Sequence, residues 1–205
     1  MKKLMIFFFS CFVSGLAFSQ VKFESGSLSS GHGPLSSGLF AEFNFSINSR
    51  DALCISLGNE DMYIMYLKSL SQKGRLFTGV SVEYYYNVPT LGYVFITKPI
   101  QTANFGLSTF TWTGISAGNP GEKVELLNWG YLFFWQSADL SFKGLTLTGA
   151  ILNYQGDWGR LVDLKYTQKL NQEFSMFISG GYNFFRDGKA LMKIGVTYKP
   201  NRLKK

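Results

Sequence analysis

The sequence predicts an all-β protein, an antiparallel up-and-down β-barrel of about twelve strands, with ten strands as the alternative. Strand-like runs of about ten residues recur at a steady spacing, apolar and polar residues alternate along them, and long helical periodicity is absent. Only 16% of the residues are charged. Because an ordinary soluble domain has roughly 25% charged residues, this composition is unusual for a cytosolic enzyme.

Residues 1–19 are predicted to be a secretory signal peptide. A basic start at Lys2 and Lys3 precedes an apolar run over 4–18, and small residues then lead to a cleavage site before Gln20. The run is short for a membrane-spanning helix, which needs about 20 residues. Acylation of Cys11, as in a lipoprotein, is the alternative for this segment.

Twelve candidate strands follow, and the turn residues between them support their limits. Asp187-Gly188, Lys143-Gly144, Gln155-Gly156 and the segment 48–51 have the composition of tight turns. The predicted strands are 21–27, 38–47, 52–58, 62–70, 75–86, 91–97, 103–113, 125–136, 144–154, 160–168, 174–185 and 190–198. Strands 62–70 and 103–113 are apolar on both faces, so their register is not defined by the sequence.

Several strands separate an apolar face from a polar one. In 75–86, for example, Val80 and Val82 share one face while Ser81 and Glu83 share the other. The polar faces are mostly Ser, Gly, Asn and Thr, which suits a crowded interior better than a surface exposed to water. The charged residues on these polar faces are Glu42, Glu83, Asp163, Lys165 and Lys193.

In this pattern, residues 20–205 resemble bacterial outer-membrane β-barrel proteins as a class. The resemblance implies a single transmembrane barrel domain over 20–198, with lipid around its apolar face. The five charged residues would then line a pore and tune its solute preference, or form ion pairs in a plugged lumen. The alternating pattern ends at Tyr198, before a basic tail over 199–205, whereas many such barrels end on an aromatic residue.

Aromatic residues near the ends of the predicted strands are expected to lie at the membrane interfaces. They are Tyr84, Tyr86, Trp112, Trp129, Trp135, Tyr154, Trp158 and Tyr198. An even number of strands places both termini on one side of the membrane. The two longest connections, 28–37 and 114–124, then lie on the other side. The segment 137–143 is the one longer connection expected on the side of the termini.

Few residues offer catalytic or metal-binding chemistry. The only histidine, His32, lies in a Ser- and Gly-rich segment and is expected to be an exposed loop residue. A lipid-modifying enzyme with a Ser–His pair is the weaker alternative for it. Cys54 is the only cysteine after cleavage, so neither a disulfide nor a zinc cluster is expected, and no cofactor or metal is predicted.

The net charge of +7 does not indicate nucleic-acid binding, because the excess lies in the signal segment and the tail. The leading hypothesis is a narrow, porin-like channel for small solutes in the outer membrane, with membrane lipid as its other partner. A non-transporting surface barrel acting through its outer loops is the second hypothesis. A lipid-modifying barrel and a soluble periplasmic barrel with an apolar ligand are the others.

Overall fold

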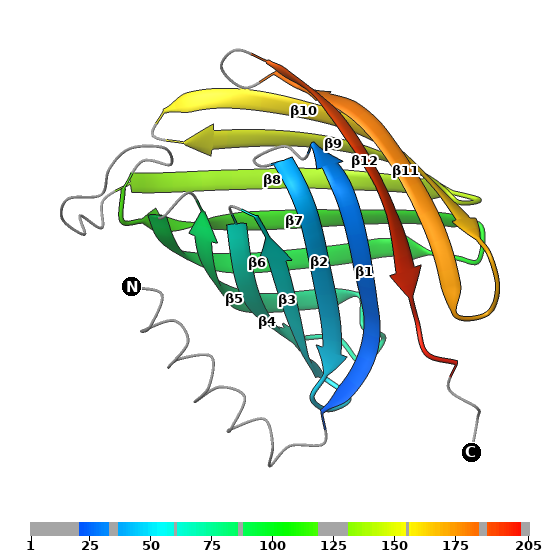
Figure 1. Ribbon diagram of the computed structural model, residues 1–205. Coiled ribbons are helices and arrows are strands. Elements are labelled where there is room, and N and C mark those ends of the chain that lie inside the picture. Colours follow the sequence, from blue (N-terminus) through cyan, green and yellow to red (C-terminus); the bar gives the residue numbers. More distant parts are fainter. Residues whose placement is uncertain are drawn as a thin grey trace.

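The computed structural model describes residues 21–32, 37–59, 61–85, 88–118, 131–154, 156–184 and 188–201. Within these ranges, twelve antiparallel strands form one closed barrel (Figure 1). Each strand pairs with its neighbours in sequence, and the first strand pairs with the last. The predicted up-and-down barrel and its strand number are therefore confirmed. No helix in the described ranges is long and apolar enough to cross a membrane.

The strand limits follow the predicted ones closely over most of the chain. The strands are β1 (Lys22–His32), β2 (Ser37–Ser46), β3 (Asp51–Gly58), β4 (Asp61–Ser69), β5 (Leu76–Tyr85), β6 (Val88–Gln101), β7 (Phe105–Ser116), β8 (Tyr131–Phe142), β9 (Leu145–Tyr154), β10 (Asp157–Lys169), β11 (Phe174–Asn183) and β12 (Lys189–Tyr198). The signal segment over 1–19 lies outside the described residues, as do the last four residues of the tail, 202–205.

Three predicted segments differ from the structure. The segment 28–37 is not a long loop, because β1 continues to His32 and β2 begins at Ser37. The segment 137–143 is mostly strand, since β8 lies six residues later than predicted and ends directly before a tight turn. Strand β6 is the longest of the twelve described strands rather than a short one, and it contains a register shift between Thr97 and Ile100.

The turns at the end of the barrel that holds both termini are short. Lys143 and Gly144 join β8 to β9, and both have positive φ angles, of 46° and 89°. Such a two-residue turn matches the twist of the strands that it connects. Between β2 and β3, the Asn48 side-chain oxygen accepts hydrogen bonds from the backbone N–H groups of Arg50 and Asp51 at 2.7 and 2.8 Å. These local contacts explain why turn composition located the hairpins correctly.

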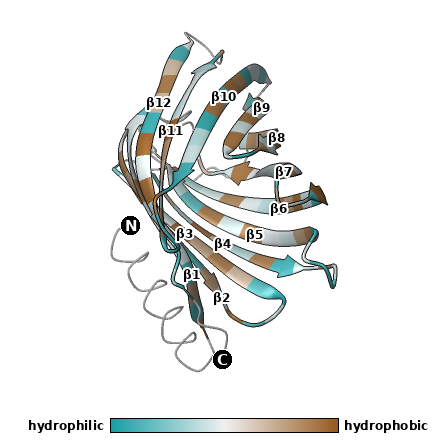
Figure 2. Cartoon of the chain, turned by 90° about the vertical axis from the view of Figure 1, so that its right-hand side faces the viewer, coloured by the Kyte–Doolittle hydropathy of each residue, from teal (hydrophilic) through white to brown (hydrophobic). Residues whose placement is uncertain are grey.

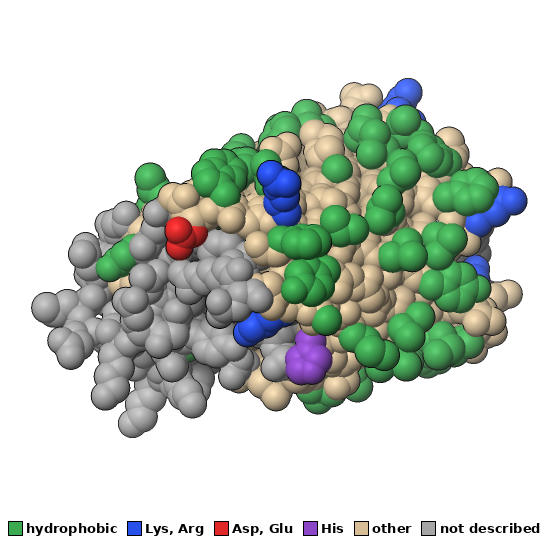
Figure 3. Space-filling view, turned by 90° about the horizontal axis from the view of Figure 1, so that it is seen from above, with side chains coloured by type: hydrophobic (Ala, Val, Ile, Leu, Met, Phe, Trp, Pro, Cys, Tyr) green, Lys and Arg blue, Asp and Glu red, His purple; other side chains and the backbone are tan. Residues whose placement is uncertain are grey.

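Hydrophobic and hydrophilic residues alternate along many of the strands (Figure 2). Since successive side chains of a strand point to opposite faces, this alternation gives the closed sheet two different faces. Many large apolar side chains are exposed on the outside, among them Val82, Leu147, Val162, Leu164, Ile178 and Ile194. Figure 3 shows apolar side chains spread over the described part of the face that it presents, with few charged groups between them. This arrangement is the reverse of a soluble barrel, in which the apolar faces would fill the interior.

Candidate functional site

The barrel encloses a cavity of about 790 Å³. Its lining is rich in hydroxyl groups, which come mainly from serines on the inner face. They include Ser25, Ser27 and Ser29 on β1, Ser56 on β3, Ser81 on β5 and Ser179 on β11. Small hydroxyl side chains leave space inside the sheet and can bind water or a polar solute.

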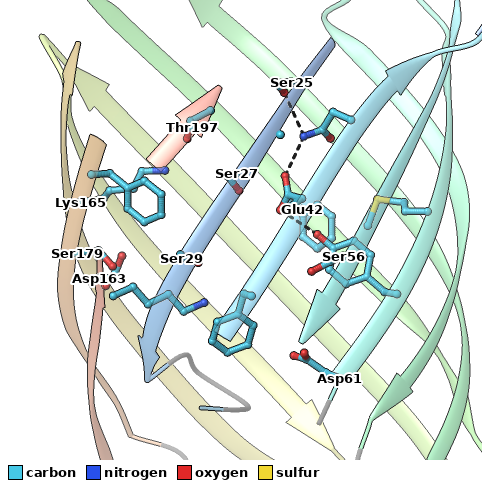
Figure 4. Close-up of a pocket in the computed structure, with 18 of the residues that line it drawn as sticks. Ser25, Ser27, Ser29, Glu42, Ser56, Asp61, Asp163, Lys165, Ser179 and Thr197 are labelled. Carbon is cyan, nitrogen blue, oxygen red and sulfur yellow. Dashed lines mark hydrogen bonds between the residues drawn. The ribbon is translucent and has the colours of Figure 1, made fainter. Parts of the chain in front are cut away.

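All five charged residues singled out in the sequence line this cavity. They are Glu42, Glu83, Asp163, Lys165 and Lys193, and Asp61 joins them. In Figure 4, Asp163 and Lys165 lie on one side of the cavity, and Glu42 and Asp61 lie on the other, with the serines of β1 between them. The cavity therefore brings these residues together.

A hydrogen-bonded chain fixes Glu42 on β2. One of its carboxylate oxygens accepts a hydrogen bond from Asn44 Nδ2 at 3.0 Å, and the other accepts one from the Tyr63 hydroxyl at 3.2 Å. Asn44 also donates to Ser25 Oγ at 3.4 Å (Figure 4). Cys54 Sγ lies 3.7 Å from the Tyr63 hydroxyl. The conformation of this carboxylate is therefore set by neutral neighbours.

The two lysines of the cavity lie beside aromatic rings. Lys193 Nζ is 4.4 Å from the centroid of the Phe40 ring, and Lys165 Nζ is 5.8 Å from that of Phe177. Both distances are within the range of a cation–π contact. Since Phe40 is on β2, the ammonium group of Lys193 reaches across β1 from its own strand, β12.

Aromatic side chains from β7 and β8 form another part of the wall. Trp112 and Trp135 are register partners and both line the cavity, together with Phe110. Trp112 Nε1 donates a hydrogen bond to Ser81 Oγ at 2.7 Å. To reach β5 the indole passes over Gly92 of β6, where a Cβ atom would lie 2.0 Å from Nε1. Glycine is required here by close approach of the indole to the backbone.

The interface prediction is wrong for the side chains of Trp112 and Trp135, because both face the lumen. In β7, threonines alternate with larger apolar residues. The side chains of Thr109, Thr111 and Thr113 lie on the outer face, so Phe110 and Trp112 face the lumen. Register did not follow from the sequence because neither face of this strand is charged. Asp61, Tyr63 and Phe177 were not singled out as cavity residues either, although Asp61 and Tyr63 share a face of β4 by spacing alone.

The other predicted interface aromatics that the structure describes lie near the ends of their strands. Trp158, at the start of β10, is 66% exposed on the outer face, and Tyr84 shares the outer face at the end of β5. Tyr198 packs against Phe23 and Phe174 at the end of the barrel that holds the termini. Tyr86 and Trp129 lie outside the described residues, as does the side chain of Tyr154. A role at a membrane interface stays a prediction for these residues.

His32 ends β1 and is exposed. It pairs in register with Met192, which is exposed on the outer face, so the histidine also lies outside the lumen. No group of three or more His, Cys, Asp or Glu residues in the described ranges could hold a metal ion.

Comparison with known proteins finds similar folds among solved structures. A NanC porin structure superposes with a TM-score of 0.62 at 9% sequence identity, covering 86% of this chain and 100% of that chain. The KdgM porin gives 0.56 at 9% identity, and its complex with disordered oligogalacturonate gives 0.53 at 11%; each covers 88% of this chain and all of its own. No protein-family model and no curated protein matches this chain. At these identities, the likeness establishes the barrel fold.

Proposed function

We propose that this protein is a porin-like channel that passes small polar solutes through the outer membrane. One observation carries the proposal: a closed barrel with an apolar outer surface encloses a cavity of about 790 Å³ lined by charged and hydroxyl side chains. Twelve strands exceed the eight whose interior is just filled by side chains, which leaves room for a passage.

The outer surface supports a location within a bilayer. A transmembrane strand needs about 9–11 residues when tilted, and the described strands have 8 to 14. Trp158 and Tyr84 at one end of the barrel and Tyr198 at the other suit the two interfacial regions of a membrane. Export by the signal segment over 1–19 would deliver the chain to the outer membrane, and membrane lipid would surround its apolar face.

The solved structures of similar fold are named as porins, and one is a complex with oligogalacturonate. That ligand is a polyanion, whereas the cavity of this chain has four carboxylates and two lysines in its lining. We therefore propose a channel function for this chain, as in the porins of similar fold, and we do not propose that it binds oligogalacturonate. We further propose that the protein is not an enzyme, since its histidine faces away from the lumen serines.

Single-channel recording in planar bilayers tests the proposal. The refolded chain is expected to give discrete current steps. In a Cys54→Ser background, a bulky thiol reagent should remove most of the current through Ser27→Cys, whose side chain faces the lumen. Leu28→Cys is the matched control, because the side chain of Leu28, next to Ser27 in the strand, is exposed on the outer face. The current through the Leu28→Cys variant should survive the reagent.

Absence of any current from a correctly folded barrel would overturn the channel proposal. It would favour a surface barrel that acts through its outer connections. Equal loss of current in both cysteine variants would show that the conducting path is not the described cavity. A chain that stays soluble without detergent would instead indicate a barrel that binds an apolar ligand.

A further inference from the structure

We propose that one wall of the cavity binds small organic cations, so that the channel prefers an organic ammonium solute to an anion. The inference rests on the proposed channel function and names the solute class. The wall combines carboxylates and aromatic rings from neighbouring strands, and we refer to it as the acid–aromatic wall. Its members are Glu42, Asp61, Tyr63, Glu83 and Trp112.

Glu83 is the first reason for this assignment. Its side chain is 8% exposed and lines the cavity. No residue in the described ranges donates a hydrogen bond to it or forms an ion pair with it. Removing a carboxylate from water without a partner is unfavourable. A cation entering the cavity would supply the missing partner.

Glu42 provides a second carboxylate on the same wall. Both of its oxygens accept hydrogen bonds, but the donors, Asn44 and Tyr63, are neutral. They fix the position of the carboxylate. A cation of the chain, Lys193 over Phe40, attracts Glu42 without forming a direct ion pair with it. Tyr63 pairs in register with Glu83, so the tyrosine lies between the two acidic residues and connects them into one surface.

Trp112 places an aromatic ring beside this surface. Its hydrogen bond to Ser81 holds the indole against β5, and Ser81 and Glu83 lie two residues apart on the same face of that strand. An indole face next to carboxylates is a suitable site for an ammonium group, because the ring quadrupole and the negative charges both attract it. Gly92 is what allows the ring to lie there.

Two aromatic rings of the cavity already have a lysine of the chain as a cation–π partner. Lys193 lies over Phe40 and Lys165 lies near Phe177, so both of these rings already have an ammonium partner. In the described part of the chain, no Lys or Arg lies over Trp112 or Trp135. Trp112 also packs against Phe133, with ring centroids 4.3 Å apart, so the part of its ring that lines the cavity is the part that a cation from outside the protein would contact.

Choline tests the inference, since it has a permanent positive charge and no N–H donor. We expect choline chloride to block the potassium current of the channel and to bind the folded barrel in titration calorimetry, whereas sodium glutamate does neither. Glu83→Gln should weaken choline binding about tenfold, because it removes the carboxylate that would attract the quaternary ammonium group. Trp112→Phe keeps a ring and should weaken it about twofold to thirtyfold.

Two matched controls separate these effects from general changes. Glu173→Gln makes the same change in the turn between β10 and β11, and Trp158→Leu removes an indole from the outer face. Choline binding should be unchanged in both. One outcome is a barrel that carries no current but binds choline in calorimetry and loses that binding in Glu83→Gln. This outcome would support the cation site and contradict the channel function. A barrel that conducts current but does not bind choline, or that binds glutamate in preference to choline, would contradict the cation site and support the channel function.

Discussion

The inner and outer faces of the same sheet differ more than any two strands of the barrel. In β10, Val162 and Leu164 are exposed on the outside, while Asp163 and Lys165 between them line the cavity. The side-chain period of two in a strand makes this possible in a single run of four residues. One sequence pattern therefore specifies both an apolar outer surface and a polar inner surface.

Strand β7 shows that the outer face does not have to be aliphatic. Its outer side carries threonines, and their hydroxyl groups have local partners: Thr113 Oγ1 donates to the Phe133 carbonyl at 3.1 Å, and Thr109 and Thr97 share a hydrogen bond of 2.8 Å. A hydroxyl group that is satisfied within the sheet can face an apolar surrounding at low cost. The requirement on the outer face is thus the absence of unsatisfied polar groups.

The largest expected effect comes from placing a charge on the outer face. Leu164 lies in the middle of β10 and is 50% exposed. Leu164→Lys should lower the free energy of unfolding by about 2–4 kcal/mol, the cost of a lysine facing lipid near the middle of a bilayer. Ser27→Lys adds the same group inside the lumen and should cost less than about 1 kcal/mol. Urea unfolding in lipid vesicles measures both, and equal losses would contradict the assignment of the faces.

Substitution of one glycine on each face of the sheet is expected to have a smaller effect on stability. A Cβ atom on Gly92 would lie 2.0 Å from Trp112 Nε1 inside the barrel, whereas one on Gly149 would have no heavy atom within 4 Å. Gly92→Ala should therefore cost about 1–3 kcal/mol, because the indole must move. Gly149→Ala should be neutral or stabilise by up to about 1 kcal/mol. The two variants are compared by urea midpoint, and by tryptophan emission as a check that the indole moves.

The smallest effect is expected from single hydroxyl groups. Tyr63→Phe removes a hydrogen bond to Glu42 inside the lumen and should cost about 1–2 kcal/mol. Tyr182→Phe makes the same change on the outer face, where the ring packs against Phe184, and should stay within about 0.5 kcal/mol. Equal losses in the unfolding measurement would show that the Glu42 contact does not stabilise the barrel.

Much of the fold could be predicted because the faces of most strands differ in polarity. Charged residues at Glu42, Asp163 and Lys193 defined the inner face of their strands, and short turns such as Lys143-Gly144 located the hairpins. Strand β8 was predicted six residues too early. Its inner face mixes Phe133 and Trp135 with Ser137 and Asp139, so no regular alternation of polar and apolar residues marked its limits. An aromatic residue has no fixed side in a barrel, so position alone could not place that strand.

The candidate site was predicted only in part, for the same reason. The charged residues were identified by alternation, whereas the aromatic part of the wall depends on contacts between strands that are distant in sequence. Trp112 reaches Ser81 across Gly92, and these residues belong to three different strands. Such a contact follows from the register of the sheet, which a strand with two uncharged faces does not reveal.

The pairing of β1 with β12 also determines when the barrel can finish folding. Seven register pairs, from Gly26 with Tyr198 to His32 with Met192, join residues at nearly opposite ends of the chain. Contacts of such high sequence separation make folding slow. Before β12 is in place, β1 and β11 are open edges whose backbone N–H and C=O groups have no partner on one side. An incomplete chain can therefore assemble hairpins but cannot produce a sheet without edges, and its exposed edges would favour aggregation.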